Sequence, residues 1–126
     1  MPKPATRDSW ELSPLPSQRE KFELPVLFSD AEGELLRLGH VPKEMEDKWF
    51  VLFEEGWLYF HRSWTGFCIF ALRLEASPNG ICVAEGWVNR DKAQYTSADI
   101  ESDKRDVQDL IKSRLLEKHS SGWASE

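Results

Sequence analysis

Apolar and polar residues follow a clear pattern in the middle of the chain, between residues 49 and 89. Four runs rich in aromatic and β-branched residues are separated by turn residues, with Glu55-Gly56 after the first run and the string SPNG before the last. Short runs of this composition, bounded by glycine, proline and asparagine, are typical of β-strands joined by tight turns. The pattern predicts four strands in an antiparallel meander.

The pattern changes after Arg90, where the chain becomes polar. From Val107 to Leu115 the apolar residues recur at helical spacing, with Asp, Lys, Arg and Gln between them. This spacing predicts an amphipathic helix that ends near Lys118 and covers one face of the meander. The fold expected is therefore α+β: an antiparallel meander of four to six strands packed against one C-terminal amphipathic helix.

Residues 22–38 allow two interpretations. Ser29 followed by Glu32 resembles a capping box, which would start a short helix. The alternative is a hairpin of two short strands, Phe22–Phe28 and Glu34–Leu38. Because Gly33 is unfavourable in a helix interior, the sequence favours the hairpin.

The two ends of the chain differ in composition from its middle. Residues 1–20 contain four prolines among polar residues, which predicts an extended, flexible lead from which Trp10 and Leu12 could dock on the domain. One α+β domain is expected over residues 21–118, and a disordered tail over residues 119–126.

The Glu55-Gly56 turn determines which side chains of the first hairpin share a face, because side chains alternate along a strand. The pairs expected on one face are Glu54–Trp57, Leu52–Tyr59 and Phe50–His61. Large apolar side chains occupy both faces, although a single helix covers only one. The face of Trp57, Tyr59 and His61 must then be covered by the N-terminal part of the chain, with residues 20–40 as the simplest cover, by another chain, or by a ligand.

The string YFHRSWTGF, residues 59–67, places versatile side chains at a chain reversal that needs only turn residues. His61 can transfer a proton near neutral pH, Arg62 can bind a carboxylate or phosphate, and Trp64 offers a flat surface. In a regular strand His61 and Ser63 point one way and Arg62 and Trp64 the other, so they converge only if the chain turns at Ser63. The predicted binding residues are Trp57, Tyr59, His61, Arg62, Ser63, Trp64, Thr65, Asn89 and Arg90.

Three functional hypotheses follow from this surface. The first is a non-catalytic module that binds a protein partner or a small anionic ligand through the aromatic face and the HRSWTG turn. The alternative is a small hydrolase or transferase acting on a nucleotide-like anion, with His61 as general base, Arg62 or Arg90 as anion clamp and Trp64 as stacking platform. The third is a homodimer that buries the aromatic face. No nucleophile-elbow spacing is present, which favours binding over catalysis.

Charge and the distribution of ligating residues exclude several classes. A formal net charge of −6 argues against a nucleic-acid-binding protein, which presents a basic surface. His40, His61 and His119 lie in unrelated segments and no CxxC spacing occurs, so neither a metal site nor a cofactor is predicted.

Cys68 and Cys82 are the only cysteines, and both lie in apolar, strand-like runs. One disulfide is conceivable, but in a chain without a recognisable export signal buried free thiols are the better interpretation. No apolar run approaches the roughly 20 residues that a membrane helix needs. The sequence therefore predicts a cytoplasmic protein without a membrane partner.

Three strings, EDKWF, GWLYFHRSWTGFCI and VNRDKAQY, resemble those of a family of small uncharacterised bacterial proteins. The resemblance covers about residues 42–96, and LYFHRSWTG is its most specific part. It implies a prokaryotic cytosolic setting and a compact domain built around the meander. The family has no assigned activity, so the resemblance implies no functional residue.

Overall fold

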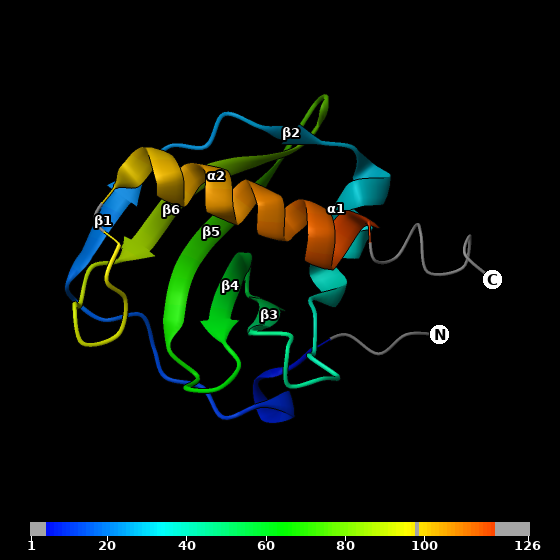
Figure 1. The fold of residues 1–126 in the computed structure, drawn as a ribbon. Helices are drawn as coiled ribbons and strands as arrows, with labels where there is room; N and C mark the ends of the chain where they lie inside the picture. Colours follow the sequence, from blue (N-terminus) through cyan, green and yellow to red (C-terminus); the bar gives the residue numbers. More distant parts are fainter. Residues whose placement is uncertain (1–4, 98, 118–126) are drawn as a thin grey trace.

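The structure, a computed structural model, describes residues 5–97 and 99–117, which form one antiparallel sheet and two α-helices (Figure 1). The strands are β1 (Arg19–Phe22), β2 (Leu27–Phe28), β3 (Trp49–Glu54), β4 (Trp57–Arg62), β5 (Cys68–Ser77) and β6 (Gly80–Asn89). The helices are α1 (Asp30–Leu38) and α2 (Ile100–Leu110), with a 3-10 turn η1 (Arg7–Ser9) and a π-helical segment η2 (Ile111–Leu116) that continues α2. The predicted tail, residues 119–126, lies outside the described residues.

The sheet has the order β1-β6-β5-β4-β3, and β2 pairs with β6 beyond β1 along the same edge. Every pair is antiparallel. The α+β fold with a C-terminal helix is thus as predicted. The register of the first hairpin is also confirmed, since Leu52 pairs with Tyr59. Its turn has positive φ at both Glu55 (52°) and Gly56 (87°), as a type I′ turn requires.

The predicted hairpin over residues 22–38 is wrong, because the second half of this segment is helix α1. The capping box is present: the Ser29 hydroxyl accepts from the Glu32 N–H at 3.0 Å, and Glu32 accepts from the Ser29 N–H at 2.8 Å. Gly33 serves packing, since a Cβ there would lie 2.9 Å from the Ile81 side chain on β6. A glycine that weakens an isolated helix therefore lets this one approach the sheet closely.

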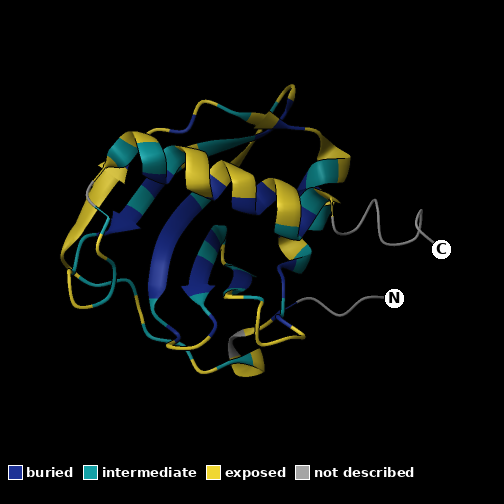
Figure 2. Ribbon diagram, in the orientation of Figure 1, coloured by how far each residue is buried: buried dark blue, intermediate teal, exposed yellow. Residues whose placement is uncertain are grey.

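Helix α2 crosses the face of the sheet that is turned toward the viewer in Figure 1. Val107, Ile111 and Leu115 point inward and join the main core with residues from the central strands, which are the most buried part of Figure 2. Helix α1 contributes Leu36 to the same core. Among the described residues, no helix has the length and apolar character needed to cross a bilayer.

The opposite face of the sheet is partly covered by residues 5–17, which we call the N-terminal segment. Trp10 stacks on Phe50 with 5.9 Å between ring centroids, and Ala5 and Leu12 join the small apolar cluster around Phe50. The expectation that residues 20–40 cover this face is wrong. Strands β1 and β2 instead extend the edge of the sheet, and α1 packs on the side of α2.

A cluster of hydrogen-bonded polar side chains connects the loop after α1 to the end of the C-terminal helix. The carboxylate of Asp47 is hydrogen-bonded to the imidazole of buried His40 and accepts from Nε of Arg114 at 3.1 Å. Burial by itself raises the pKa of Asp47, but the hydrogen bonds and charges of His40 and Arg114 outweigh burial and hold the pKa below its ordinary value. Folding is therefore linked to the ionisation of this carboxyl group.

Asp47→Asn is expected to lower the free energy of unfolding by about 1–2 kcal/mol near pH 7, through lost charge-assisted hydrogen bonds. Because the folded pKa is depressed, this contribution is complete above the ordinary pKa and is lost as the pH falls through the folded value. The difference between wild type and variant, measured by urea unfolding, should thus shrink as the pH falls below about 4. Asp109→Asn, which alters an exposed carboxylate of α2, is the control. A difference that persists undiminished in acid would contradict this account.

Candidate functional site

A groove of about 570 Å³ lies between the N-terminal segment and the sheet face opposite α2. We call it the aromatic groove. Its lining residues are Leu12, Ser13, Pro14, Leu15, Arg19, Leu52, Trp57, Tyr59, His61, Cys68, Ala71, Glu85 and Trp87. Its volume is within the range of small-molecule sites, which are concave, mostly apolar and supplied with a few polar groups.

The aromatic groove is deep because a small side chain on its central strand lies between large side chains on the two neighbouring strands. Ala71 on the central strand β5 pairs with Tyr59 on β4 and with Trp87 on β6. Side chains paired across a sheet share a face, so a methyl group lies between two large rings. Trp57 extends the β4 wall, with its ring nearly parallel to that of Tyr59 at 6.3 Å between centroids. The aromatic walls are half-buried, and Ala71 forms a buried floor.

Arg19 and Glu85 bring charge to the aromatic groove. The Arg19 guanidinium lies over the Trp87 ring, 5.1 Å from its centroid. Glu85 accepts from Nε1 of Trp87 at 2.6 Å and lies 3.5 Å from Nε of Arg73. The Trp87 hydrogen bond, with smaller contributions from Lys21 and Arg73, lowers the pKa of Glu85, although desolvation opposes it. Glu85 is therefore an ionised carboxylate that already has donors.

Two groups in the aromatic groove have the chemistry of catalysts but are buried. The Nδ1 atom of His61 lies 2.9 Å from the carbonyl oxygen of Gly66, and because a carbonyl only accepts, Nδ1 carries the proton. Burial raises the pKa of the Cys68 thiol to about 12, against a smaller opposing hydrogen bond. A thiol with that pKa is protonated at neutral pH and is a poor nucleophile.

The HRSWTG turn holds the N-terminal segment in place. Nε1 of Trp10 donates to the carbonyl oxygen of Ser63 at 2.7 Å, and the N–H of Ser13 donates to that of Gly66 at 2.9 Å. Gly66 has φ of 79°, and a Cβ at this position would overlap the carbonyl oxygen of Glu11. The turn therefore binds the segment that forms one wall of the aromatic groove through its backbone carbonyl groups and its glycine.

The other side chains of the turn lie outside the aromatic groove. Arg62 points to the helix side, where its guanidinium lies 4.7 Å from the centroid of the Trp49 ring. The hydroxyl of Ser63 donates to the carbonyl oxygen of Asp47, and that of Thr65 accepts from the N–H of Phe67. Trp64 is exposed and donates to the carbonyl oxygen of Met45 at 3.1 Å. The chain does turn at Ser63, but the turn directs these groups to different neighbours.

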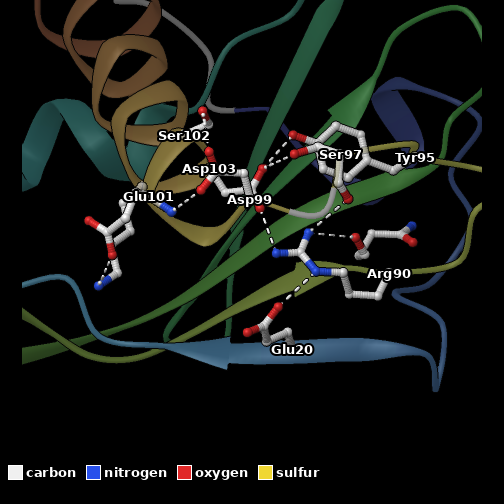
Figure 3. Close-up of polar contacts among 10 residues, drawn as sticks. Glu20, Arg90, Tyr95, Ser97, Asp99, Glu101, Ser102 and Asp103 are labelled. Carbon is white, nitrogen blue, oxygen red and sulfur yellow. Dashed lines mark hydrogen bonds and ion pairs between the residues drawn. The ribbon is translucent and has the colours of Figure 1, made fainter.

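Arg90 belongs to a separate network at the end of β6 (Figure 3), and Asn89 precedes it as the last residue of that strand. Arg90 forms ion pairs with Asp103 of α2 at 2.7 Å and with Glu20 of β1 at 2.8 Å. Burial by itself would lower the pKa of Arg90, but these two carboxylates raise it. The buried amide of Asn89 donates to the carbonyl oxygen of Cys68 at 2.9 Å. Arg90 therefore connects β1 with α2, and Asn89 connects the end of β6 with β5 and with the loop that follows β6.

Asp103 is the centre of this network and is fully buried. Besides Arg90, it accepts from the phenol of Tyr95 at 2.8 Å and from the hydroxyl of Ser97 at 2.9 Å. Burial and the neighbouring Asp103 carboxylate raise the pKa of Tyr95 to about 12. Three donors thus surround one buried charge at the first turn of α2.

Of the nine predicted binding residues, three line the aromatic groove together: Trp57, Tyr59 and His61. The sequence pattern indicates that Leu12 could dock on the domain, but it does not point to Arg19, Glu85, Trp87 or residues 13–15 as lining residues. Arg19 and Lys21 do alternate with Glu20 in the string REKF, which is a weak strand signal. Nothing local in that string shows that it pairs with residues 86–89, as β1 does.

Cys68 and Cys82 are both free thiols, and Cys68 is buried as predicted, whereas Cys82 is only partly buried. Within the described part of the chain, no three His, Cys, Asp or Glu side chains are placed to hold a metal ion.

Comparison with protein-family models, with curated proteins and with solved structures finds no match. The function must therefore be argued from the geometry of the site.

Proposed function

We propose that this protein is a non-catalytic binding module that takes a small, flat, largely apolar ligand in the aromatic groove. The proposal rests on the arrangement of side chains across β4, β5 and β6, where aromatic walls flank the small residue Ala71. Paired strands lie about 4.8 Å apart, so rings on β4 and β6 are separated by about 10 Å. A ring placed halfway would lie about 5 Å from each wall, within the range of stable aromatic pairs.

The contacts of the groups with catalytic chemistry favour binding over the hydrolase or transferase alternative. The Ser63 hydroxyl donates to a backbone carbonyl, and the Cys68 thiol has a pKa raised to about 12. His61 is only 4% exposed and lies at the buried end of the aromatic groove, with Nδ1 toward Gly66. The two free cysteines support the predicted cytoplasmic location, where thiols remain reduced.

The proposal predicts that a flat neutral aromatic compound binds at the aromatic groove, and 2-naphthamide is a suitable probe. In amide NMR spectra, its addition should shift signals from Leu12, Ser13 and Leu15 and from the Trp57 and Trp87 indoles. Trp57→Ala should weaken binding about tenfold, because it removes one wall contact of about 1–2 kcal/mol.

The matched control is Trp64→Ala, which removes an exposed tryptophan outside the aromatic groove. This variant should bind the probe like wild type. Shifts scattered over the surface, or equal weakening by the two substitutions, would overturn the proposed function.

A further inference from the structure

Charge is distributed unevenly around the aromatic groove. Arg19 lines it, and Lys21, two residues further along β1, lies on the same face with its ammonium 6.0 Å from the Trp87 ring centroid. Glu85 is the one carboxylate in the lining, and it interacts with the Trp87 indole, with Arg73 and with the charge of Lys21. Among residues 5–97 and 99–117, no carboxylate forms an ion pair with Arg19. The β1 end of the aromatic groove therefore has an excess of positive charge, in a chain whose net charge is −6.

Arg19 is exposed, and its guanidinium lies over the Trp87 ring, 5.1 Å from the ring centroid. This cation–π contact favours rotamers that keep the guanidinium beside the aromatic groove. The planar guanidinium has several N–H donors that suit the two oxygens of a carboxylate. Arg19 and Trp87 line the aromatic groove together, so a ring that binds against Trp87 lies within reach of the guanidinium.

We infer that the ligand of the aromatic groove is an aromatic carboxylate, with its ring between Tyr59 and Trp87 and its carboxylate bound by Arg19. This inference rests on the proposed function and adds the chemical class of the ligand to it. Lys21 does not line the groove, but its charge adds to the positive electrostatic potential at the β1 end of the groove. The groove volume of about 570 Å³ accommodates one fused-ring acid with room for further substituents.

The anion is a single carboxylate and not a nucleotide polyphosphate. The lining contains one cation, Arg19, whereas phosphate chains are bound by several cations or by a cradle of backbone N–H groups. Residues 12–15 form the wall that the N-terminal segment contributes. They are two leucines, a proline and a serine, and bring no charge to the groove. One fixed positive charge beside aromatic walls is complementary to one carboxylate on a ring.

A matched pair of probes tests the inference: 2-naphthoate and 2-naphthamide have the same ring, and the second lacks the charge. Isothermal titration calorimetry at low salt should show the wild-type protein binding naphthoate about tenfold more tightly than naphthamide. Arg19→Gln should remove this preference and leave the affinity for naphthamide unchanged. Arg105→Gln, which removes an exposed cation of α2, should leave both affinities as in wild type.

The outcomes separate this inference from the proposed function. Equal affinities of wild type for the two probes, or a preference for naphthoate that survives in Arg19→Gln, would overturn the assignment of an aromatic carboxylate while leaving the binding module in place. If neither probe shifts the NMR signals of the aromatic groove, the inference and the proposed function both fail.

Discussion

Asp103→Asn is expected to lower the free energy of unfolding by about 3 kcal/mol, because charge-assisted hydrogen bonds to a buried carboxylate are lost and Arg90 keeps only Glu20 as its anion. The Asp103 carboxylate is inaccessible to solvent and accepts from Arg90, Tyr95 and Ser97. An amide cannot accept from all three donors as a carboxylate does, and it brings N–H groups of its own. Since small domains have unfolding free energies of about 5–15 kcal/mol, the variant should be marginally stable.

Asp99→Asn is the matched control for this prediction, since Asp99 is the exposed N-cap of α2 and asparagine caps helices about as well as aspartate. Urea unfolding followed by tryptophan fluorescence should show little change for the control. The pKa of Tyr95 should also decrease in Asp103→Asn, because the negative charge that helps to raise it is removed. A loss of less than about 1 kcal/mol would show that the network does not stabilise the junction of β1, β6 and α2.

Gly66→Ala is expected to destabilise the protein by about 2–4 kcal/mol. Part of this is the cost of a left-handed conformation in alanine, about 1–2 kcal/mol. The remainder comes from the N-terminal segment, which must move because the new Cβ overlaps the Glu11 carbonyl oxygen. That movement would break the hydrogen bonds that Trp10 and Ser13 donate to the turn.

Gly56→Ala separates the two contributions. Gly56 also has positive φ (87°), but nothing lies within 4 Å of a Cβ placed there. It should therefore show the backbone cost alone. Hydrogen exchange gives the second readout: the Ser13 amide, bonded to the Gly66 carbonyl, should lose protection in Gly66→Ala and keep it in Gly56→Ala. Equal destabilisation by both substitutions, with Ser13 still protected, would mean that the turn does not hold the N-terminal segment.

The parts of the fold that could be predicted depend on local signals. The Glu55-Gly56 turn and the alternation on either side of it determine the register of β3 and β4, and hence the shared face of Trp57, Tyr59 and His61. Helix α2 has an apolar repeat of its own. For α1 the local signals conflicted, because the capping box favoured a helix and Gly33 opposed it. Packing of Gly33 against Ile81, a contact across 48 positions of the chain, explains the glycine.

The aromatic groove could be predicted only in part, because two of its walls come from distant segments. Trp87 faces Tyr59 across Ala71, which requires the register of three strands at once. Arg19 reaches the groove through pairing between β1 and β6, where Arg19 lies opposite Asn89. The sequence drew attention to the HRSWTG turn, yet its role depends on backbone carbonyl groups and on a missing Cβ. Neither feature has a signature that points to residues 10–13 as the partner.

We propose that the HRSWTG turn positions the N-terminal segment, and that this segment completes an aromatic groove that binds a ligand. The most direct test is the affinity of 2-naphthoate for Gly66→Ala and Gly56→Ala beside wild type. Displacement of the wall formed by residues 12–15 should weaken binding about tenfold in Gly66→Ala, while Gly56→Ala binds like wild type. Wild-type affinity in both variants would contradict the claim.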